Sequence, residues 1–262
     1  MPRKRDGITL RCIVPSTGTV VISRQQSNGQ GRGSNTWTSP DGCAMFTIHC
    51  NISLQSLLGQ RLSLLQLIAA VAIVQAIEKS PEYKSMNLKI KWPNDIFIGE
   101  ESKLGGILAT SSISGDDSSI TIGCGVNIHN SSPSICVNDV INNINKTKNM
   151  TLDEFTTEEF IVRTLNFVNT WISDLTTNNQ SNANKSINHF YRIYESLWMH
   201  QNKEVFVEKW NESVKVIGID EYGFLRVQKK DGQTLTLHAD AHSFDVKQNI
   251  IREKMMISPK LC

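Results

Sequence analysis

The chain has 262 residues, and its 27 Lys and Arg against 25 Asp and Glu give a formal net charge of +2. This near balance argues against a dedicated nucleic-acid binder, which normally carries a surplus of basic residues. Apolar residues make up 39% of the chain, a share that excludes general disorder. The length suits one sizeable core with a small second domain.

The six cysteines are spread along the chain, and none forms a C-x-x-C pair. This spacing indicates neither a zinc site nor a disulfide framework, and a reducing compartment fits best. We therefore expect a cytoplasmic protein, with the mitochondrion as the alternative. The most apolar stretch, residues 62–77, is interrupted by Ser63, Gln66 and Gln75. It is also shorter than the roughly 18 residues of a membrane helix, so we expect a buried helix and no membrane span.

The first elements are predicted to be strands and one long helix. Residues 20–22 and 43–49 have the β-branched or alternating apolar residues of strands. Between them, residues 24–37 contain glycines but no aliphatic residue, which predicts a loop. Residues 53–79 carry Leu, Ile and Ala at intervals of three and four, and this broad apolar face predicts a helix that lies against a sheet.

The middle of the chain predicts an antiparallel meander, because turn residues separate four strand-like runs. The predicted strands are residues 88–91, 96–99, 104–113 and 119–128. Residues 129–150 are polar, so we expect irregular structure there.

Two further amphipathic helices are predicted, at residues 155–175 and 187–200. The Asn-rich residues 176–186 between them predict a mobile loop. From residue 202 the pattern changes to short strands separated by glycine-containing turns. We therefore expect a larger domain over residues 1–200 and a small all-β domain over residues 201–262.

The glycine-rich loop is a candidate anion site. Gly29, Gly31 and Gly33 stand at alternate positions, and glycines let backbone N–H groups approach an anion closely. Arg32 lies among them, and its guanidinium can hold a carboxylate or phosphate with two parallel hydrogen bonds. The loop matches neither a Walker loop nor a G-x-G-x-x-G turn that opens a helix. A surface loop that binds nothing is the alternative interpretation.

A second polar group follows the first strand of the meander. Pro93 ends that strand because it cannot donate a ladder hydrogen bond, and Asn94 and Asp95 suit a turn. Lys91 therefore gathers with them at one strand end, and Lys103 follows beside paired glycines. Lysines, an amide and a carboxylate suit a phosphate-bearing ligand with a metal ion. The alternative is a hairpin corner with surface charges.

The last strand of the meander contains Gly123 and Gly125. Glycines inside a strand weaken it, and they often mark the close approach of a ligand or of another backbone. Asn127 would direct its amide from the end of this strand. A hydrogen-bonded amide at the edge of the core is the alternative interpretation of Asn127.

Taken in order, these motifs resemble the biotin–protein ligase family, in particular the animal holocarboxylase synthetases. The resemblance runs from about residue 20 to about residue 249. The motifs that carry it are residues 29–33 with Trp37 and Ser39-Pro40, then residues 91–95, 103–108 and 123–127. Residues 217–219 and 242–245 resemble parts of the family's small C-terminal barrel.

The resemblance implies an α+β fold related to the class II aminoacyl-tRNA synthetases, with a mixed, mainly antiparallel sheet and helices, followed by a small SH3-like β-barrel. It implies an ATP-dependent ligase that uses Mg2+. The carboxylate of biotin attacks the α-phosphate of MgATP, which gives biotinoyl-5′-AMP and pyrophosphate. A lysine of a biotin-acceptor domain of a carboxylase then attacks the mixed anhydride and releases AMP. No nucleic acid or membrane partner is implied, and the chain would be a monomer or a homodimer.

The resemblance also implies roles for the candidate residues. Arg32 and Lys103 are the catalytic candidates, because cations can neutralise the two anions that must meet. Both are expected to contact biotin, and Arg32 and Asp95 to contact ATP, with Asp95 also in the shell of Mg2+. The remaining implied biotin contacts are Gln26, Gly29, Gly31, Gly105, Gly106 and Gly123. The remaining implied ATP contacts are Trp37, Lys91, Asn94 and Asn127.

One part of the family pattern is not matched. In the family, a strand and a helix precede the glycine loop and bring a Ser-Thr pair to the biotin pocket. Here twenty residues precede Val21, and Ser16-Thr17 stands close to the loop. This mismatch leaves open a truncated, non-catalytic form that binds a nucleotide or a partner. A lipoate-type ligase of the same superfamily is a separate alternative.

Overall fold

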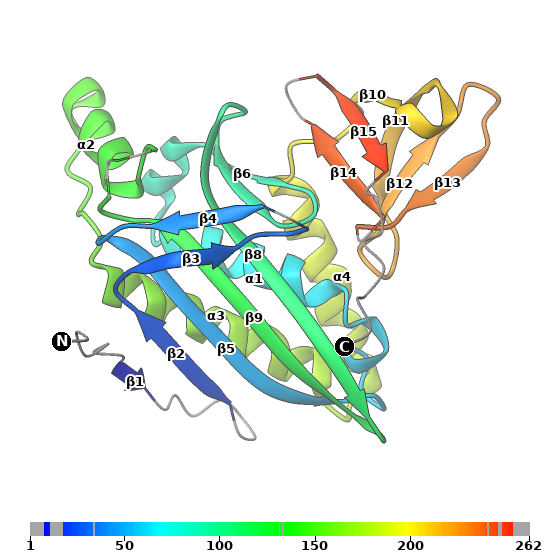
Figure 1. Cartoon of the computed structure of the whole chain (residues 1–262), viewed down its shortest axis with the longest axis horizontal. Coiled ribbons are helices and arrows are strands. Elements are labelled where there is room, and N and C mark those ends of the chain that lie inside the picture. The colour runs from blue at the N-terminus through cyan, green and yellow to red at the C-terminus, as the bar shows by residue number, and fades with distance from the viewer. Residues whose placement is uncertain are drawn as a thin grey trace.

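Two sheets organise the chain (Figure 1). The computed structural model describes residues 8–10, 18–33, 35–130, 132, 134–239, 241–245 and 248–253, so Ser16 and Thr17 lie outside the described part. The larger sheet has seven strands in the order β1-β2-β5-β9-β8-β7-β6, and all its pairings are antiparallel. These strands are β1 (Ile8–Leu10), β2 (Thr19–Ser23), β5 (Cys43–Ser53), β6 (Leu88–Lys91), β7 (Asp95–Ile98), β8 (Ser102–Ser114) and β9 (Asp117–Asn127).

The meander predicted over residues 88–128 is confirmed as β6, β7, β8 and β9. Alternation along the strands decides which face of the sheet is buried. In β5, Phe46 and Ile48 lie in the core, whereas His49 and Asn51 are exposed. One face of the sheet therefore carries the hydrophobic core, and the opposite face is open.

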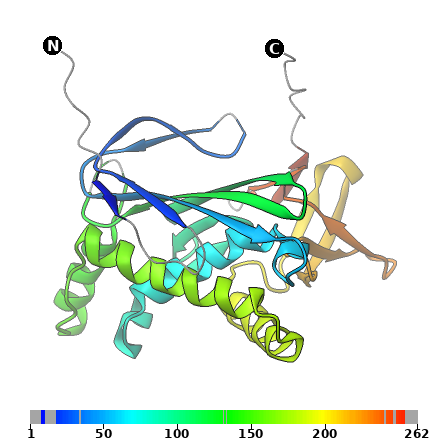
Figure 2. The same cartoon turned by 90° about the horizontal axis from the view of Figure 1, so that it is seen from below.

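Helices cover the buried face of the larger sheet, as Figure 2 shows. Helix α1 (Leu64–Ile77) packs against β8 on one side and against α3 (Thr157–Thr176) on the other. Every residue of α1 except Gln66 and Gln75 is buried, because the helix lies between the sheet and other helices. The predicted contact of this helix with a sheet is therefore confirmed.

The start of the long helix was predicted wrongly. The expected helix began at residue 53, but α1 begins at Leu64, after a 3-10 turn at Gly59–Arg61. A Cβ on Gly59 would overlap the carbonyl of Ser53, so the chain folds tightly back on itself here. The backbone N–H of Leu58 also donates to the carbonyl of Leu175 at 3.2 Å. A bond to a distant segment thus replaces the first turns of the predicted helix.

Two segments predicted as irregular contain helices. Helix α2 (Val137–Lys148) begins with a capping box, in which Asp139 and Cys136 each accept from the backbone N–H of the other at 3.1 and 3.4 Å. Helix α4 (Gln180–Leu197) begins inside the predicted mobile loop, where the Asn179 side chain accepts from the N–H of Asn182 at 3.1 Å. In both cases capping by polar side chains starts a helix in a sequence that looks like a loop.

The second sheet contains six strands in the order β13-β12-β11-β10-β15-β14, with β10 and β15 parallel. The predicted short strands after residue 202 are thereby confirmed. The bounds are β10 (Glu204–Val207), β11 (Glu212–Ile219), β12 (Leu225–Gln228), β13 (Thr234–Leu237), β14 (His242–Asp245) and β15 (Ile250–Glu253), with a 3-10 turn at Glu208–Trp210.

The second sheet is attached to the first through the turn between β6 and β7. The indole N–H of Trp92 donates to the carbonyl of Gly223 at 2.9 Å, and its backbone N–H donates to Nε2 of His200 at 3.0 Å. The His200 ring in turn packs edge-on against Phe244 of β14, with 4.3 Å between ring centroids. Among the helices in the described part of the chain, none has the length and apolar character needed to cross a membrane.

Candidate functional site

A large cavity lies on the open face of the larger sheet, next to a separate two-stranded hairpin. Strands β3 (Gln26–Gln30) and β4 (Thr36–Ser39) pair only with each other among the described strands. Figure 2 shows this hairpin across the face of the sheet opposite to the helices. The cavity has a volume of about 1560 Å³. Pockets for one small ligand hold about 300–1,000 Å³, so this cavity can hold two ligands side by side.

The predicted glycine-rich loop is therefore in part a β-hairpin. Gly29 faces Trp37 across the two strands, and a Cβ on Gly29 would overlap the carbonyl of Trp37. The absence of a side chain is what permits this pairing. Composition alone suggested a loop because glycine-rich segments rarely form strands in isolation.

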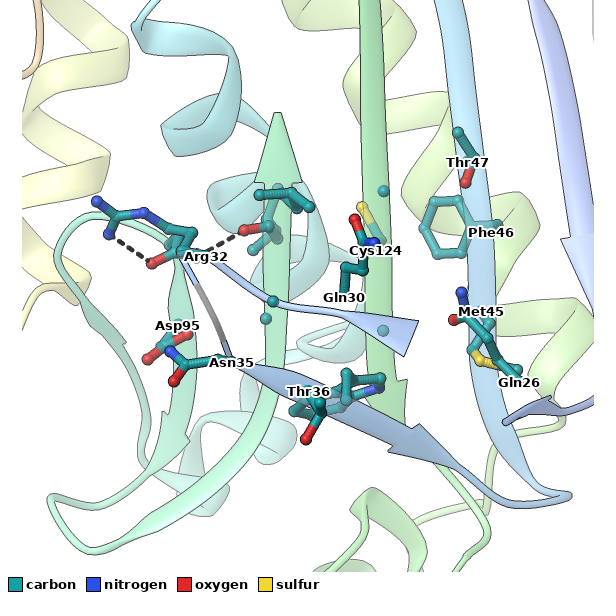
Figure 3. Close-up of a pocket in the computed structure, with 18 of the residues that line it drawn as sticks. Gln26, Gln30, Arg32, Asn35, Thr36, Met45, Phe46, Thr47, Asp95 and Cys124 are labelled. Atoms are coloured by element: carbon teal, nitrogen blue, oxygen red, sulfur yellow. Dashed lines mark hydrogen bonds between the residues drawn. The ribbon is translucent and has the colours of Figure 1, made fainter. Parts of the chain in front are cut away.

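Arg32 lies in the turn of this hairpin, at one end of the cavity (Figure 3). Its Nη1 donates to the side-chain oxygen of Asn94 at 3.2 Å, and its Nη2 donates to the carbonyl of Ala239. Asn94 belongs to the β6–β7 turn, and Ala239 lies between β13 and β14. The guanidinium thus connects three segments that are far apart in the sequence.

Asp95 holds the second candidate cation. Its Oδ1 accepts from Nζ of Lys103 at 2.7 Å, and its Oδ2 lies 3.6 Å from Nζ of Lys91. The Asp95 and Lys91 side chains are mostly buried, whereas that of Lys103 is 40% exposed. Asn94 and Asp95 are neighbours in the chain, so consecutive residues hold the guanidinium of Arg32 and the ammonium of Lys103.

The lining of the cavity carries more positive than negative charge. Four cationic side chains contribute to it, against the two carboxylates of Asp41 and Asp95. The cationic residues are Arg24, Arg32, Lys91 and Lys103. A cavity of this charge favours anionic ligands.

Trp37 forms a wall beside Lys103. The Lys103 ammonium lies 5.4 Å from the centroid of the Trp37 ring. On its other side the indole lies against Gly125, where an added Cβ would come within 2.7 Å of Nε1. The glycine of β9 therefore lets a flat aromatic ring lie directly on the sheet, as the unusual glycines in this strand suggested.

The opposite end of the cavity carries apolar, amide and hydroxyl side chains, and the exposed ion pair of Arg24 and Asp41, 3.1 Å apart, also belongs to the lining. Figure 3 shows Gln26 there with Met45, Phe46 and Thr47 of β5. Gly123 contributes open space, since an added Cβ would meet nothing closer than 3.7 Å. An apolar surface with a few hydroxyl and amide groups suits an uncharged ring system.

Cys124 lies beside the cavity, and its burial disfavours the thiolate form. Burial raises the pKa of its thiol to about 12, so the thiol stays protonated near neutral pH. Only the thiolate attacks carbon or phosphorus efficiently. Burial likewise raises the pKa of Cys43, which lies under Trp37. Covalent catalysis by either cysteine does not fit these surroundings.

Ten of the predicted site residues line the same cavity. They are Gln26, Gly31, Arg32, Trp37, Lys91, Asn94, Asp95, Lys103, Gly106 and Gly123.

The structure does not bring the other three predicted site residues to the cavity. Gly29 allows the close pairing of β3 with β4. Gly105 allows the close pairing of β8 with β9, because a Cβ on Gly105 would come within 2.6 Å of the carbonyl of Gly125. The amide of Asn127 bonds instead to the neighbouring loop: it accepts from Asn130 at 2.9 Å and donates to the carbonyl of Ile135 at 3.4 Å. This is the core interpretation that the sequence left open.

Several residues that line the cavity were not among the site residues predicted from the sequence. Thr47 and Leu108 stand on the open face of β5 and β8, where alternation alone could have placed them. Ser243 and Phe244 come from β14 of the second sheet. No local signal connects these two to the site, because their position depends on how the two sheets pack.

A magnesium site was predicted at Asp95. Its one carboxylate is shared between two lysines, and no group of three His, Cys, Asp or Glu residues gathers anywhere in the described chain. Mg2+ prefers several oxygen ligands, which include water and substrate phosphates. These residues do not fit a metal held by the protein alone, and phosphate oxygens would have to supply most of the ligands.

Known ligases are similar to this chain over much of its length. Residues 10–127 match the biotin/lipoate A/B protein ligase family. The biotin–protein ligase of Homo sapiens is 37% identical over 238 residues, which are 90% of this chain and 32% of the human protein. Biotin–protein ligase 2 of Arabidopsis thaliana is 28% identical over 247 residues, which are 91% of this chain and 70% of that protein.

Among solved structures, the fold resembles that of the Aquifex aeolicus biotin protein ligase in complex with biotin and ATP. The TM-score is 0.61 at 17% identity, and the match covers 90% of this chain and 89% of that one. The match to the biotin/lipoate A/B protein ligase family covers residues 10–127, a little under half of the chain. The human and Arabidopsis relatives each match about nine tenths of the chain, and the chain spans about a third of the human protein.

Proposed function

We propose that this chain is an ATP-dependent ligase that activates biotin as biotinoyl-5′-AMP and transfers it to a lysine of a carboxylase acceptor domain. One observation carries the proposal: consecutive residues, Asn94 and Asp95, hold Arg32 and Lys103 in a cavity large enough for two ligands. The relatives named above add support, since they are biotin–protein ligases and the Aquifex structure contains biotin and ATP.

In the first step a carboxylate oxygen of biotin attacks the α-phosphorus of ATP, and the bond from this phosphorus to the pyrophosphate oxygen breaks. Two anions must approach each other. Arg32 and Lys103 lower their repulsion, and charged groups fixed in place before the reaction need no rearrangement during it. Lys91 would meet the phosphates, and Trp37 offers a flat surface for the adenine base.

In the second step the amine of an acceptor lysine attacks the acyl carbon, and the bond to AMP breaks. The amine loses a proton to solvent, and the products are an amide and AMP. We propose that biotin occupies the end of the cavity near Gln26 and Gly123, with its carboxylate toward Lys103. The apolar, amide and hydroxyl side chains of that end suit the ring system of biotin.

Mg2+ enters in this proposal as part of the MgATP substrate. When bound, it neutralises phosphate charge and polarises the phosphoryl oxygens. Asp95 acts on the lysines rather than as the main ligand of the metal. We further propose that residues 1–200 form the ligase domain, that residues 201–262 form a separate β-domain, and that the protein works in the cytoplasm.

The test incubates the chain with biotin, MgATP and an isolated acceptor domain. We expect release of pyrophosphate and biotin attached to one lysine. Arg32→Ala and Lys103→Ala should each lower the rate of adenylate formation by about 100- to 1,000-fold, as does removal of an oxyanion donor. Lys146→Ala, which removes an exposed cation on α2, should leave the rate unchanged.

The same assay separates the alternatives. A faster reaction with lipoate than with biotin would indicate the lipoate-type ligase. Absence of pyrophosphate release, with binding of biotin or ATP retained, would indicate a non-catalytic form. Equal rates for the wild type and Arg32→Ala would contradict the assigned role of the guanidinium.

A further inference from the structure

Asn94 is built into the fold through β8. The residue is 9% exposed. Its Nδ2 donates to the carbonyl of Ile107 at 2.6 Å, and its backbone carbonyl accepts from the N–H of Ile107 at 2.9 Å. Both bonds join Asn94 to the backbone of Ile107, so they attach the β6–β7 turn to β8. The side-chain N–H makes the hydrogen bond that a backbone N–H would make in a strand pair, and this bond fixes the direction of the Asn94 side chain.

The remaining end of this amide faces the guanidinium. Oδ1 of Asn94 accepts from Nη1 of Arg32 at 3.2 Å, across 62 residues of sequence. The nitrogen and the oxygen of the side chain are thus both bonded inside the protein. A hydrogen bond to a charged donor is stronger than one between neutral groups, so this contact can set the position of the guanidinium.

Asp95, the next residue in the chain, holds the second cation. Asp95 holds Lys103 at 2.7 Å, and a Cβ on Gly106 of β8 would lie 3.3 Å from Oδ1 of Asp95. Because Asn94 and Asp95 are adjacent and Asn94 is anchored to β8, one rigid turn sets the spacing between guanidinium and ammonium. Reacting anions need such fixed spacing, since small errors in position are costly.

We propose that Asn94 is a positioning residue, which acts on the substrates through Arg32 and does not itself contact the nucleotide. This inference rests on the proposed ligase function. It replaces the predicted role of Asn94 as an ATP contact with a role in aligning the two cations that face the substrates.

A double-mutant cycle tests the proposal. Pyrophosphate release with biotin and MgATP is measured for the wild type, Asn94→Ala, Arg32→Ala and the double variant, and biotin affinity is measured by calorimetry. Asn94→Ala should lower kcat/KM by up to about 100-fold in the wild type, because the guanidinium is misplaced. In the Arg32→Ala background the same change should have almost no effect. Independent losses that multiply in the double variant would overturn the proposal.

Two further variants separate positioning from folding. Asn138 is also buried, and its amide bonds both backbone groups of Phe155 at 2.9 Å. Asn138→Ala should lower the melting temperature as Asn94→Ala does, but it should leave kcat/KM unchanged. Asn94→Asp keeps an acceptor for Arg32 but loses the Nδ2–H donor to Ile107, so it should regain only part of the activity that Asn94→Ala loses. If the losses of the folded Asn94 variants persist undiminished in the Arg32→Ala background, positioning through Arg32 is excluded.

The outcomes for the function and for the inference are distinct. A wild-type chain that releases no pyrophosphate refutes the ligase proposal. An active wild type in which the Asn94 and Arg32 losses multiply refutes only the positioning role.

Discussion

At the scale of single residues, the site depends on a few polar groups that bind to each other. Asp95 lies between Lys91 and Lys103, and the two ammonium groups are 3.6 and 2.7 Å from its oxygens. Both lysines face the cavity, so the carboxylate keeps two like charges close together where they can meet phosphate oxygens. Neutralising Asp95 should therefore change orientation more than affinity.

We predict that Asp95→Asn lowers kcat by about 10- to 100-fold, because Lys103 loses the group that orients it. The KM for MgATP should stay equal or fall, since two lysines are then available to the phosphates. Steady-state kinetics at several Mg2+ concentrations measure both quantities. A requirement for much more Mg2+ in the variant would show instead that Asp95 holds the metal.

Two glycines of β9 distinguish the two ends of the cavity. A Cβ on Gly125 would press on Trp37, with 2.7 Å to Nε1, whereas a Cβ on Gly123 would meet ordinary contacts from 3.7 Å outward. We predict that Gly125→Ala weakens ATP binding by at least about tenfold, because overpacking of about 1–3 kcal/mol displaces the ring. Gly123→Ala should fold normally and weaken biotin binding instead.

Calorimetry with each ligand in turn tests this pair of variants. The glycines are two residues apart on one strand, so each variant is the control for the other. The same loss of both ligands in both variants would contradict the division of the cavity between biotin and nucleotide.

At the scale of elements, the β3–β4 hairpin is the part of the site that depends least on the core. It pairs with no other described strand, yet it carries Arg32 and Trp37. Its ordering relies on Gly29 and on the turn closed by Gly31, whose N–H donates to the carbonyl of Asn35 at 2.8 Å. A substitution that disrupts this hairpin should therefore abolish ligand binding without unfolding the rest of the protein.

We predict that Gly29→Ala abolishes detectable ligand binding, because the new Cβ overlaps the carbonyl of Trp37. The melting temperature should fall by only a few degrees, since the core lies on the other face of the sheet. Gly33→Asn is the control: Gly33 has φ of 67°, which Asn tolerates, and a Cβ there meets nothing within 4 Å. Thermal unfolding and biotin titration of both variants measure the effect.

Helices α1 and α2 differ in how well the spacing of apolar residues predicts where a helix forms. Helix α2 has buried apolar residues spaced three and four apart, at Val137, Val140, Ile141 and Ile144, so a signal was present in the sequence. Its polar surroundings obscured this signal. The start of α1 is different, because its first predicted turns are lost to a hydrogen bond between Leu58 and Leu175, which no local pattern contains.

At the scale of the whole molecule, His200 joins the two sheets. Burial lowers its pKa to about 3, and nearby Lys203 and Lys91 act in the same direction. Nε2 accepts the N–H of Trp92, so the ring is neutral and carries its proton on Nδ1. Protonation would place a charge between Trp198 and Phe244, where nothing compensates it among the described residues.

We predict an acid-labile fold. The folded pKa of His200 lies below the unfolded value of about 6.5, so its stabilising contribution is complete above that pH and is lost as pH falls toward about 3. Within this window the unfolded state binds more protons, and stability should fall by up to about 1.4 kcal/mol per pH unit from this group. Urea unfolding at pH 7.5, 6 and 5 measures the slope.

His200→Gln should reduce that slope, because glutamine does not titrate and its carbonyl can still accept from Trp92. His189→Gln, at an exposed position on α4, should keep the slope of the wild type. An unchanged slope in His200→Gln would assign the acid lability to other groups.

The sequence by itself determined the α+β class, the four-stranded meander, the small β-rich end and the residue types of the site. Alternation, turn residues and ordered motifs are local properties, so they can be read along the chain. Only the tertiary structure decided which candidates share a cavity. It brought Arg32 to Asn94 and to Ala239, turned Asn127 toward a loop, and added Phe244 from the second sheet. The contact of Arg32 with Ala239 joins residues 207 positions apart, and both it and the place of Phe244 in the cavity exist because buried surfaces pack the two sheets together.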